Sequence, residues 1–231
     1  MNSKSLIYFA DLPDMELAVS TAYDSIYANM GEVCNAGSRI YVERAIYADF
    51  VDQFIAEGQG AYTPGDPLDP ETNMGSMISE KHLATVDGFI QKGIDEGASL
   101  LYGGVSGNDQ KGFFAKPTLF DNLKENMTIA RDEIFGPVLG ILTVNNTEDA
   151  LKIANNSKYG LHASVFTQDI NEAFHMAKRL PCGTVSVNTF SEGDIKTPFG
   201  GYKQSGSLSR DQGTEAMNQY LQTKTIWISH E

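Results

Sequence analysis

The sequence predicts an α/β fold in which a mostly parallel β-sheet carries helices on both faces. Two observations lead to this prediction. Short apolar runs of strand length alternate with longer segments in which apolar residues recur at helical spacing, and this alternation is typical of βαβ units. The chain has 231 residues, 41% of them hydrophobic, which is enough to bury a sizeable core.

The first part of the chain is expected to form two strands, two helices and a long loop. Asp14 is a suitable N-cap for the first helix, in which apolar residues between Leu17 and Ile26 recur at helical spacing. The stretch after Gly60 is rich in Pro and Gly and is expected to be a loop. The expected elements are a strand at 5–10, a helix from 14 to about 31, a strand at 39–42, a helix at 45–58 and the loop at 60–77.

The remainder of the chain continues the alternation and contains no internal sequence repeat. Ser79 is expected to begin a helix that extends to about Glu96. The elements expected after it are strands at 99–104 and 137–144, a helix at 146–155, a strand at 163–167, a helix at 171–180 and a strand at 184–188. Because strands and helices alternate, most neighbouring strands are expected to run parallel.

Charge and cysteine content exclude several classes of function. The formal net charge of -13 argues against nucleic acids and anionic membranes as partners, because both need clustered Lys and Arg. Cys34 and Cys182 lie far apart in the sequence and form neither a disulfide framework nor a metal-ligand spacing, so no metal is expected and both thiols are expected to be free. No stretch approaches the roughly 20 apolar residues of a membrane span. These features predict a cytoplasmic protein.

Three connecting segments are candidates for function: 29–38 (NMGEVCNAGS), 131–138 (RDEIFGPV) and 197–206 (TPFGGYKQSG). Parallel sheets carry their reactive groups on loops at the carboxyl ends of strands, so these segments are expected at that edge. Cys34 is flanked by two glycines, which permit unusual backbone angles and close approach of a substrate. Its neighbouring backbone N–H groups could bind an oxyanion. The alternative is a packed, inert thiol, since free cysteine is among the most buried residue types.

The same three segments resemble motifs of the NAD(P)-dependent aldehyde dehydrogenase superfamily, and the resemblance extends over essentially the whole chain. It implies that Cys34 is the catalytic nucleophile, that Glu133 holds the ribose next to the nicotinamide, and that Phe135 packs beside the nicotinamide ring. The implied cofactor is NAD or NADP. Without the resemblance, the favoured interpretations are a solvated charge for Glu133 and a core aromatic for Phe135.

The resemblance also implies a chemistry for the thiol. A cysteine thiolate adds to an aldehyde to give a thiohemiacetal, which loses hydride to become a thioester that water cleaves. In the family, an asparagine that stabilises the oxyanion and a glutamate that activates this water lie upstream of the segments present here, as does the dinucleotide-binding domain. Glu32, two residues before the cysteine, is a candidate replacement base.

The expected organisation is therefore a catalytic domain at residues 1–218 that lacks the N-terminal dinucleotide-binding domain. Residues 219–231 have the pattern of a strand, include the sole tryptophan, and match the family's C-terminal oligomerisation strand. The expected partners are a small-molecule aldehyde and either further copies of the chain or a missing dinucleotide-binding half.

The acidic sequence SEGD, which contains Glu192 and Asp194, resembles the branch of the family that acts on γ-glutamylamino, guanidino and other ω-aminoaldehydes of polyamine breakdown. Carboxylates at the mouth of a pocket would attract a cationic amine or guanidinium. The alternative is an exposed acidic loop. Two other functions remain open for the whole chain, namely an inactive fragment that serves as an interaction module and a cofactor-independent thiol esterase.

Overall fold

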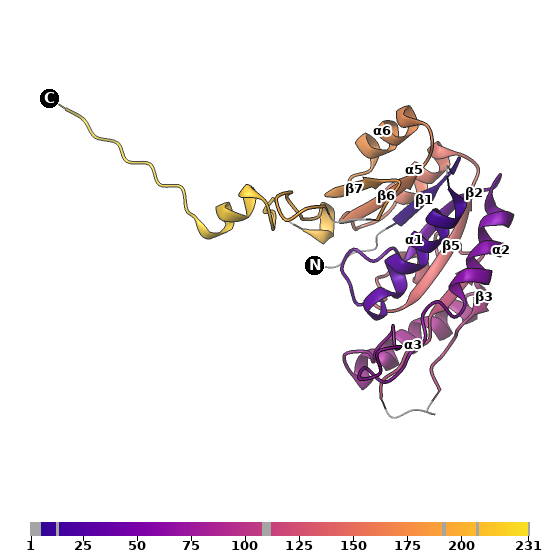
Figure 1. Ribbon diagram of the computed structural model, residues 1–231. Helices are drawn as coiled ribbons and strands as arrows, with labels where there is room; N and C mark the ends of the chain where they lie inside the picture. Colours follow the sequence, from indigo (N-terminus) through magenta and orange to yellow (C-terminus); the bar gives the residue numbers. More distant parts are fainter. Residues whose placement is uncertain (1–5, 13, 108–111, 191–192, 207, 231) are drawn as a thin grey trace.

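A computed structural model describes residues 6–12, 14–107, 112–190, 193–206 and 208–230 (Figure 1). Within these residues, seven strands form one sheet in the order β3-β4-β5-β2-β1-β6-β7. Only β3 and β4 pair antiparallel, and the other neighbours are parallel, which confirms the predicted sheet. The strands are β1 (Leu6–Phe9), β2 (Arg39–Glu43), β3 (Ser99–Tyr102), β4 (Thr118–Asp121), β5 (Val138–Val144), β6 (His162–Phe166) and β7 (Thr184–Val187).

The helices begin where the sequence places polar N-caps. The side chains of Asp14, Ser79 and Asn146 each accept a hydrogen bond from a backbone N–H in the first turn of the helix that follows. The helices are α1 (Met15–Tyr27), α2 (Tyr47–Gly58), α3 (Glu80–Asp95), α4 (Thr128–Arg131), α5 (Thr147–Asn155) and α6 (Ile170–Arg179). The first helix ends four residues earlier than expected, because Asn29 and Met30 have left-handed backbone angles.

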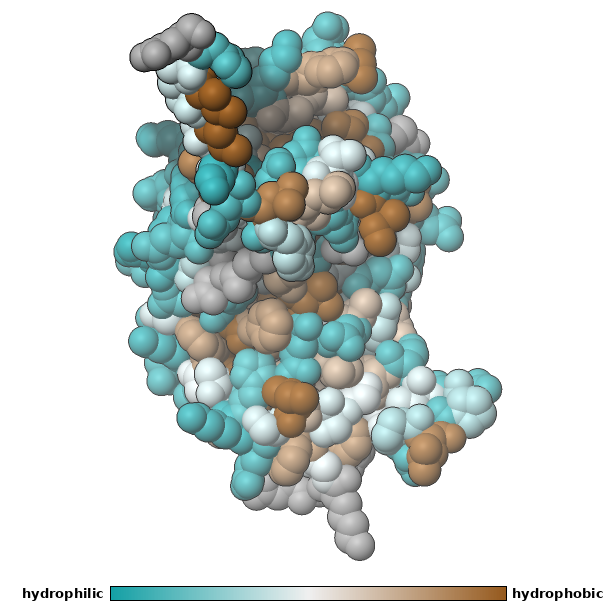
Figure 2. Space-filling view, turned by 90° about the vertical axis from the view of Figure 1, so that its left-hand side faces the viewer, coloured by the Kyte–Doolittle hydropathy of each residue, from teal (hydrophilic) through white to brown (hydrophobic). Residues whose placement is uncertain are grey.

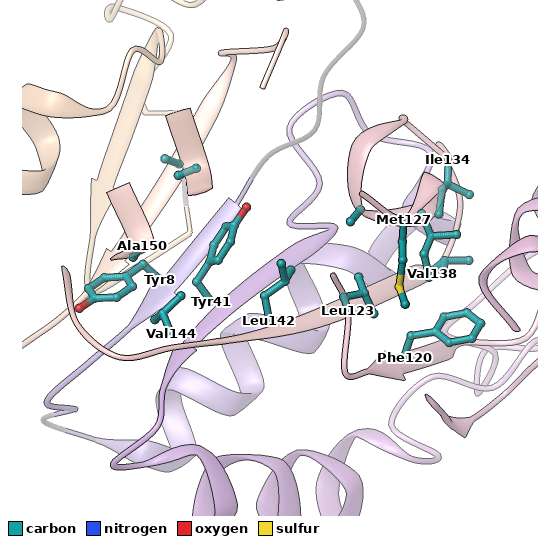
Figure 3. Packing of buried hydrophobic residues seen from close by; sticks show 14 of the residues in the cluster. Tyr8, Tyr41, Phe120, Leu123, Met127, Ile134, Val138, Leu142, Val144 and Ala150 are labelled. Carbon is teal, nitrogen blue, oxygen red and sulfur yellow. The ribbon is translucent and has the colours of Figure 1, made fainter. Parts of the chain in front are cut away.

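Helices cover both faces of the sheet, as predicted (Figure 1). Side chains alternate between the two faces along each strand, so that Ile7 and Phe9 of β1 pack with α1 and α2, whereas Tyr8 packs in the core on the side of α3, α5 and α6. Figure 3 shows part of the core on the side of α3, α5 and α6. In it, Tyr8, Tyr41 and Leu142 belong to a series of side chains spread across the sheet. Each face therefore has its own apolar core.

One strand and one α-helix of the described chain were not expected from the sequence. Strand β4 lies between β3 and β5, pairs antiparallel with β3 and parallel with β5, and extends the sheet to its β3 edge. Helix α4 is a single turn just before the segment that contains Glu133. Each has only four residues, but so do the predicted strands β1, β3 and β7, so length alone does not explain why they were not expected.

The three candidate segments lie at the amino ends of the parallel strands, so the expected carboxyl-end location is wrong. Cys34 follows α1 and precedes β2, and a helix between two parallel strands returns the chain to the amino edge. Glu133 and Phe135 precede β5 in the same way. The third segment follows β7 but folds back toward this edge, where the Tyr202 N–H donates to the carbonyl of Gly160, just before β6 (2.7 Å).

In this single chain, the described residues of the predicted C-terminal strand, 219–230, form no strand. Residues 214–220 make a 3₁₀ helix, and residues 221–230 extend away from the sheet without β pairing (Figure 1). A strand needs a hydrogen-bonded neighbour, and none of the described strands lies beside this segment. On the side from which the segment extends, apolar side chains lie in small groups among polar ones (Figure 2). No helix in the described part of the chain has the length and apolar content to cross a membrane.

Candidate active site

The turn that carries Cys34 packs directly on the segment before β5. Gly31 has a φ of +69°, and a Cβ at this position would lie 2.4 Å from the Gly136 carbonyl oxygen. Only glycine fits both the backbone angle and this spacing. On the other side of Cys34, Gly37 has an ordinary φ, but a Cβ there would lie 2.5 Å from Oγ of Ser25 in α1. The absence of a side chain at the two glycines thus allows the turn to pack closely on α1 and on the segment that contains Gly136.

Cys34, Glu133 and Phe135 line one small cavity at this junction. The residues around it are Ile26, Gly31, Val33, Cys34, Ala36, Ser38, Glu133, Ile134, Phe135 and Gly136. Its volume of about 10 Å³ is enough for roughly one water molecule. Phe135 has a φ of +57°, rare for an aromatic residue, and the residue is 37% exposed. The structure therefore brings together the three residues for which the sequence predicts catalytic and cofactor-binding roles.

Glu32 directly precedes Val33 and Cys34 in the sequence, but it does not line this cavity. Its carboxylate accepts a hydrogen bond from the Ile78 N–H (3.2 Å) and lies 3.5 Å from His82 Nε2. The Glu32 side chain is only 10% exposed. These contacts engage the carboxylate with the residues that begin α3, and they give Glu32 a structural role that the sequence did not indicate.

His82 in the first turn of α3 is a residue that sequence reasoning missed. Its Nε2 donates a hydrogen bond to the carbonyl oxygen of Phe135 (2.7 Å), and the two rings meet edge to face with centroids 6.1 Å apart. A lone histidine on a helix has no spacing pattern that marks it, so only the fold shows that it lies beside the site.

Comparison with known proteins agrees with this geometry. A model of the aldehyde dehydrogenase family matches residues 1–226. The chain belongs to the aldehyde dehydrogenase family. It is 42% identical over 225 residues to the NADP/NAD-dependent aldehyde dehydrogenase PuuC of Escherichia coli, covering 97% of this chain and 44% of PuuC.

Solved structures of aldehyde dehydrogenases share the fold. KauB from Pseudomonas aeruginosa superposes with a TM-score of 0.93 at 42% identity, covering 98% of this chain and 46% of KauB. A γ-glutamyl-γ-aminobutyraldehyde dehydrogenase from Burkholderia cenocepacia superposes with a TM-score of 0.89 at 40% identity, covering 95% of this chain and 44% of that protein. An indole-3-acetaldehyde dehydrogenase solved with NAD⁺ superposes with a TM-score of 0.94 at 42% identity, covering 99% of this chain and 46% of that chain. The chain thus spans less than half the length of each of these relatives.

The second cysteine of this aldehyde dehydrogenase family member lies in a different environment. Cys182 packs against the core on the side of α3, α5 and α6. Burial raises the pKa of its thiol to about 11, although the positive charges of Arg39 and Lys203 oppose the shift. A thiol with so high a pKa is a poor nucleophile near neutral pH.

The acidic loop that resembles an aminoaldehyde-binding segment is only partly described. Glu192 lies outside the described residues, and Asp194 is exposed. The Asp194 carboxylate accepts a hydrogen bond from the Lys196 N–H (2.9 Å), and its backbone carbonyl accepts one from the Thr197 hydroxyl (2.6 Å). Asp194 does not line the Cys34 cavity. These contacts show that it shapes a turn, and its role toward a substrate stays a prediction.

One polar side chain next to the nucleophile is incompletely satisfied. Asn35 is buried, and its amide oxygen has no hydrogen-bond partner among the described residues. A buried carbonyl group of this kind is normally paired with protein or water. No group of three or more His, Cys, Asp or Glu side chains suited to a metal ion occurs in the part of the chain that the structure describes.

Proposed function

We propose that this chain is the catalytic portion of an NAD- or NADP-dependent aldehyde dehydrogenase, with Cys34 as nucleophile. The observation that carries the proposal is the cavity shared by Cys34, Glu133 and Phe135. These residues come from two segments that are far apart in the sequence and meet through the contact of Gly31 with Gly136. Membership in the family supports the reaction class, and the shared cavity supports the choice of residues.

The proposed reaction starts at the sulfur of Cys34. The thiolate attacks the aldehyde carbon, a C–S bond forms, and the carbonyl electrons move to oxygen, where the Cys34 backbone N–H stabilises the negative charge. A bound nicotinamide cofactor supplies the acceptor for the hydride that leaves the former aldehyde carbon. Water then cleaves the resulting thioester, releases a carboxylic acid and regenerates the thiol. Glu32 is not assigned as the base for this water, because its carboxylate is already engaged by Ile78 and His82.

Glu133 and Phe135 are suited to hold the nicotinamide end of a dinucleotide. The ring of Phe135 is partly uncovered at the cavity, and a flat aromatic cofactor ring would cover it. A carboxylate such as that of Glu133 can accept hydrogen bonds from ribose hydroxyls. We propose that the rest of the cofactor site and the general base lie in polypeptide outside this sequence, since the relatives are more than twice as long.

The proposed substrate class is an ω-aminoaldehyde. Among the similar proteins, the Burkholderia enzyme is named for γ-glutamyl-γ-aminobutyraldehyde. Asp194 lies on an exposed turn and, with Glu192, would place negative charge where a cationic substrate approaches. Oligomerisation through residues 221–230 is a further part of the proposal, because this segment is extended and unpaired in the single chain.

The proposed function is tested with the chain alone and with the chain fused to the dinucleotide-binding half of PuuC. The isolated chain should not oxidise aldehydes at an appreciable rate, because loss of a general base costs about 10²–10⁴-fold and loss of an oxyanion donor about 10²–10³-fold. The fusion should reduce NAD or NADP, and Cys34→Ala should abolish that reduction. The PuuC half alone serves as the control.

Each other outcome of this test contradicts part of the proposal. Cofactor-dependent oxidation by the isolated chain, abolished by Cys34→Ala, would show that the missing half is not required. Ester hydrolysis that needs Cys34 but no cofactor would favour a thiol esterase. A folded fusion that binds cofactor but is inactive would favour an interaction module.

The substrate class is tested by neutralising the acidic loop in the active fusion. The double variant Glu192→Gln with Asp194→Asn should lower kcat/KM for a cationic aminoaldehyde by about five-fold per carboxylate, the upper range for exposed ion pairs. An uncharged aldehyde of similar length should be nearly unaffected, and added salt should shrink the difference. Equal losses for both substrates would mean that the loop only supports the site structurally.

A further inference from the structure

We propose that His82 is a positioning residue that fixes the Cys34 turn and the Phe135 segment relative to each other. The proposal extends the proposed function, because both segments belong to the candidate active site. It assigns no contact between His82 and the substrate or cofactor. Its basis is that one imidazole nitrogen lies within reach of both segments.

The contacts of His82 link three separate parts of the chain. Its Nε2 donates to the Phe135 carbonyl oxygen at 2.7 Å and lies 3.5 Å from Glu32 Oε1. The same Glu32 oxygen accepts the Ile78 N–H at 3.2 Å. Glu32 is two residues before Cys34, so a shift of the imidazole or the carboxylate would be passed to the nucleophile through the turn.

Phe135 needs such a contact because its backbone conformation is unfavourable by itself. A φ of +57° is rare for an aromatic residue and persists only where the surrounding structure holds it. His82 binds the carbonyl oxygen of that residue and packs edge to face on its ring. Without His82, we expect Phe135 to relax toward an ordinary φ, which would rotate its carbonyl and move its ring at the cavity.

Helix α3 is a suitable anchor for this contact. Its first turn is capped by Ser79, whose hydroxyl accepts the backbone N–H of His82 itself (3.2 Å). One turn further along, Val86 packs so closely on Gly136 that a Cβ at Gly136 would lie 2.6 Å from Val86 Cγ2. The helix thus contacts the Phe135 segment twice, once through packing and once through the His82 hydrogen bond. Packing sets the separation, and the hydrogen bond sets the orientation of the Phe135 carbonyl.

The experiment compares His82→Leu, His82→Gln and the control Lys81→Ala. Leucine keeps apolar bulk but cannot donate, whereas the glutamine amide can donate to the Phe135 carbonyl. Lys81 is exposed in the same helical turn. The readout is the alkylation rate of Cys34 by iodoacetamide in the folded chain, with Cys182 replaced by Ser in every variant. Folding is checked by the urea midpoint.

We expect His82→Leu to raise the Cys34 alkylation rate by about five-fold, because a looser junction opens the small cavity around the thiol. The Cys34 alkylation rates of the His82→Gln and Lys81→Ala variants should each stay within about two-fold of the parent rate. A rate for His82→Leu equal to that of Lys81→Ala would overturn the proposal, and so would equal rates for the Leu and Gln variants. If the Leu variant does not fold, Glu32→Gln is the second test. This variant removes the negative charge that faces His82 but keeps an oxygen that can accept the Ile78 N–H. It should also raise the alkylation rate of Cys34, and an unchanged rate would overturn the proposal.

A second readout separates this proposal from the proposed function. In the active fusion, His82→Leu should raise KM for the nicotinamide nucleotide several-fold more than KM for the aldehyde, because Phe135 lies on the cofactor side of the proposed site. An equal change in both would contradict a positioning role toward Phe135. An inactive fusion in which alkylation of Cys34 still responds to His82 would reject the proposed function and leave the positioning role standing.

Discussion

Cys34 and Cys182 have the same chemistry, and their surroundings make them different. Cys34 lies on a turn at a small cavity, whereas Cys182 packs against the apolar core, where burial raises the pKa of its thiol to about 11. Only the thiolate is a nucleophile, so the ionised fraction decides which cysteine reacts. At pH 8, a pKa of about 11 leaves about 0.1% of Cys182 ionised.

We therefore predict that a small electrophile labels Cys34 well before Cys182 in the folded protein. Labelling of Cys182 should rise about ten-fold per pH unit up to about pH 10, because its thiolate fraction grows in that proportion below its pKa. Peptide mass spectrometry after timed quenching measures both rates. Cys34→Ser and Cys182→Ser identify each signal, and labelling in urea shows the rates without burial. Equal labelling of the two cysteines in the folded chain would reject Cys34 as the reactive thiol.

At the scale of secondary-structure elements, close backbone packing builds the candidate site. The turn after α1 meets the segment before β5 at Gly31 and Gly136, and α3 packs on Gly136 through Val86. Glycine is needed at Gly31 for its positive φ and at both positions for the space that a Cβ would take. The site thus depends on contacts between elements that are distant in the sequence.

Gly31→Ala should destabilise the fold by at least about 2 kcal/mol, because the new Cβ meets the Gly136 backbone in a backbone conformation unfavourable for alanine. The matched control is Gly88→Ala in α3, where a Cβ would have no neighbour within 4 Å. That substitution should stabilise the protein by about 0.5–1 kcal/mol, since alanine is the better helix former. Urea unfolding followed by circular dichroism measures both. A Gly31→Ala variant as stable as the parent would show that the turn can move away from Gly136.

These elements also show what could be predicted from the sequence. Periodicity and polar caps such as Asp14 and Ser79 placed most of the helices and strands, because their causes are local. The edge of the sheet that carries the site was mispredicted. A segment between a helix and the next parallel strand must lie at the amino edge, so the order of α1, Cys34 and β2 already contained the answer. The role of His82 could not be predicted, because it depends on how α3 packs against a segment about 50 residues away.

At the scale of the whole molecule, the two cores are buried against the sheet, whereas the C-terminal segment is exposed. The sheet is covered on both faces, whereas residues 221–230 leave it and are exposed (Figure 1). This segment contains four large apolar side chains, Leu221, Ile226, Trp227 and Ile228, and Trp227 is 90% exposed. Exposed apolar groups of this kind mark contact surfaces. The family resemblance implies that the segment takes part in oligomerisation. Its lack of β pairing in the single chain is compatible with a strand that needs a second chain as its neighbour.

We predict that the chain self-associates through residues 221–230 and that removing them leaves the fold intact. A chain ending at Tyr220 should sediment as a smaller species than the full chain. Its free energy of unfolding should differ from that of the dissociated full chain by less than about 0.5 kcal/mol, because the segment does not pack on either core. Trp227 is the only tryptophan, so its fluorescence should shift to shorter wavelength as rising protein concentration buries it. Ile226→Asp with Ile228→Asp should abolish the association, whereas Lys224→Ala, in the same segment, should retain it. If full-length and shortened chains sediment alike at every concentration and the emission of Trp227 does not move, the segment has no role in self-association, and its apolar side chains must be covered by a different polypeptide.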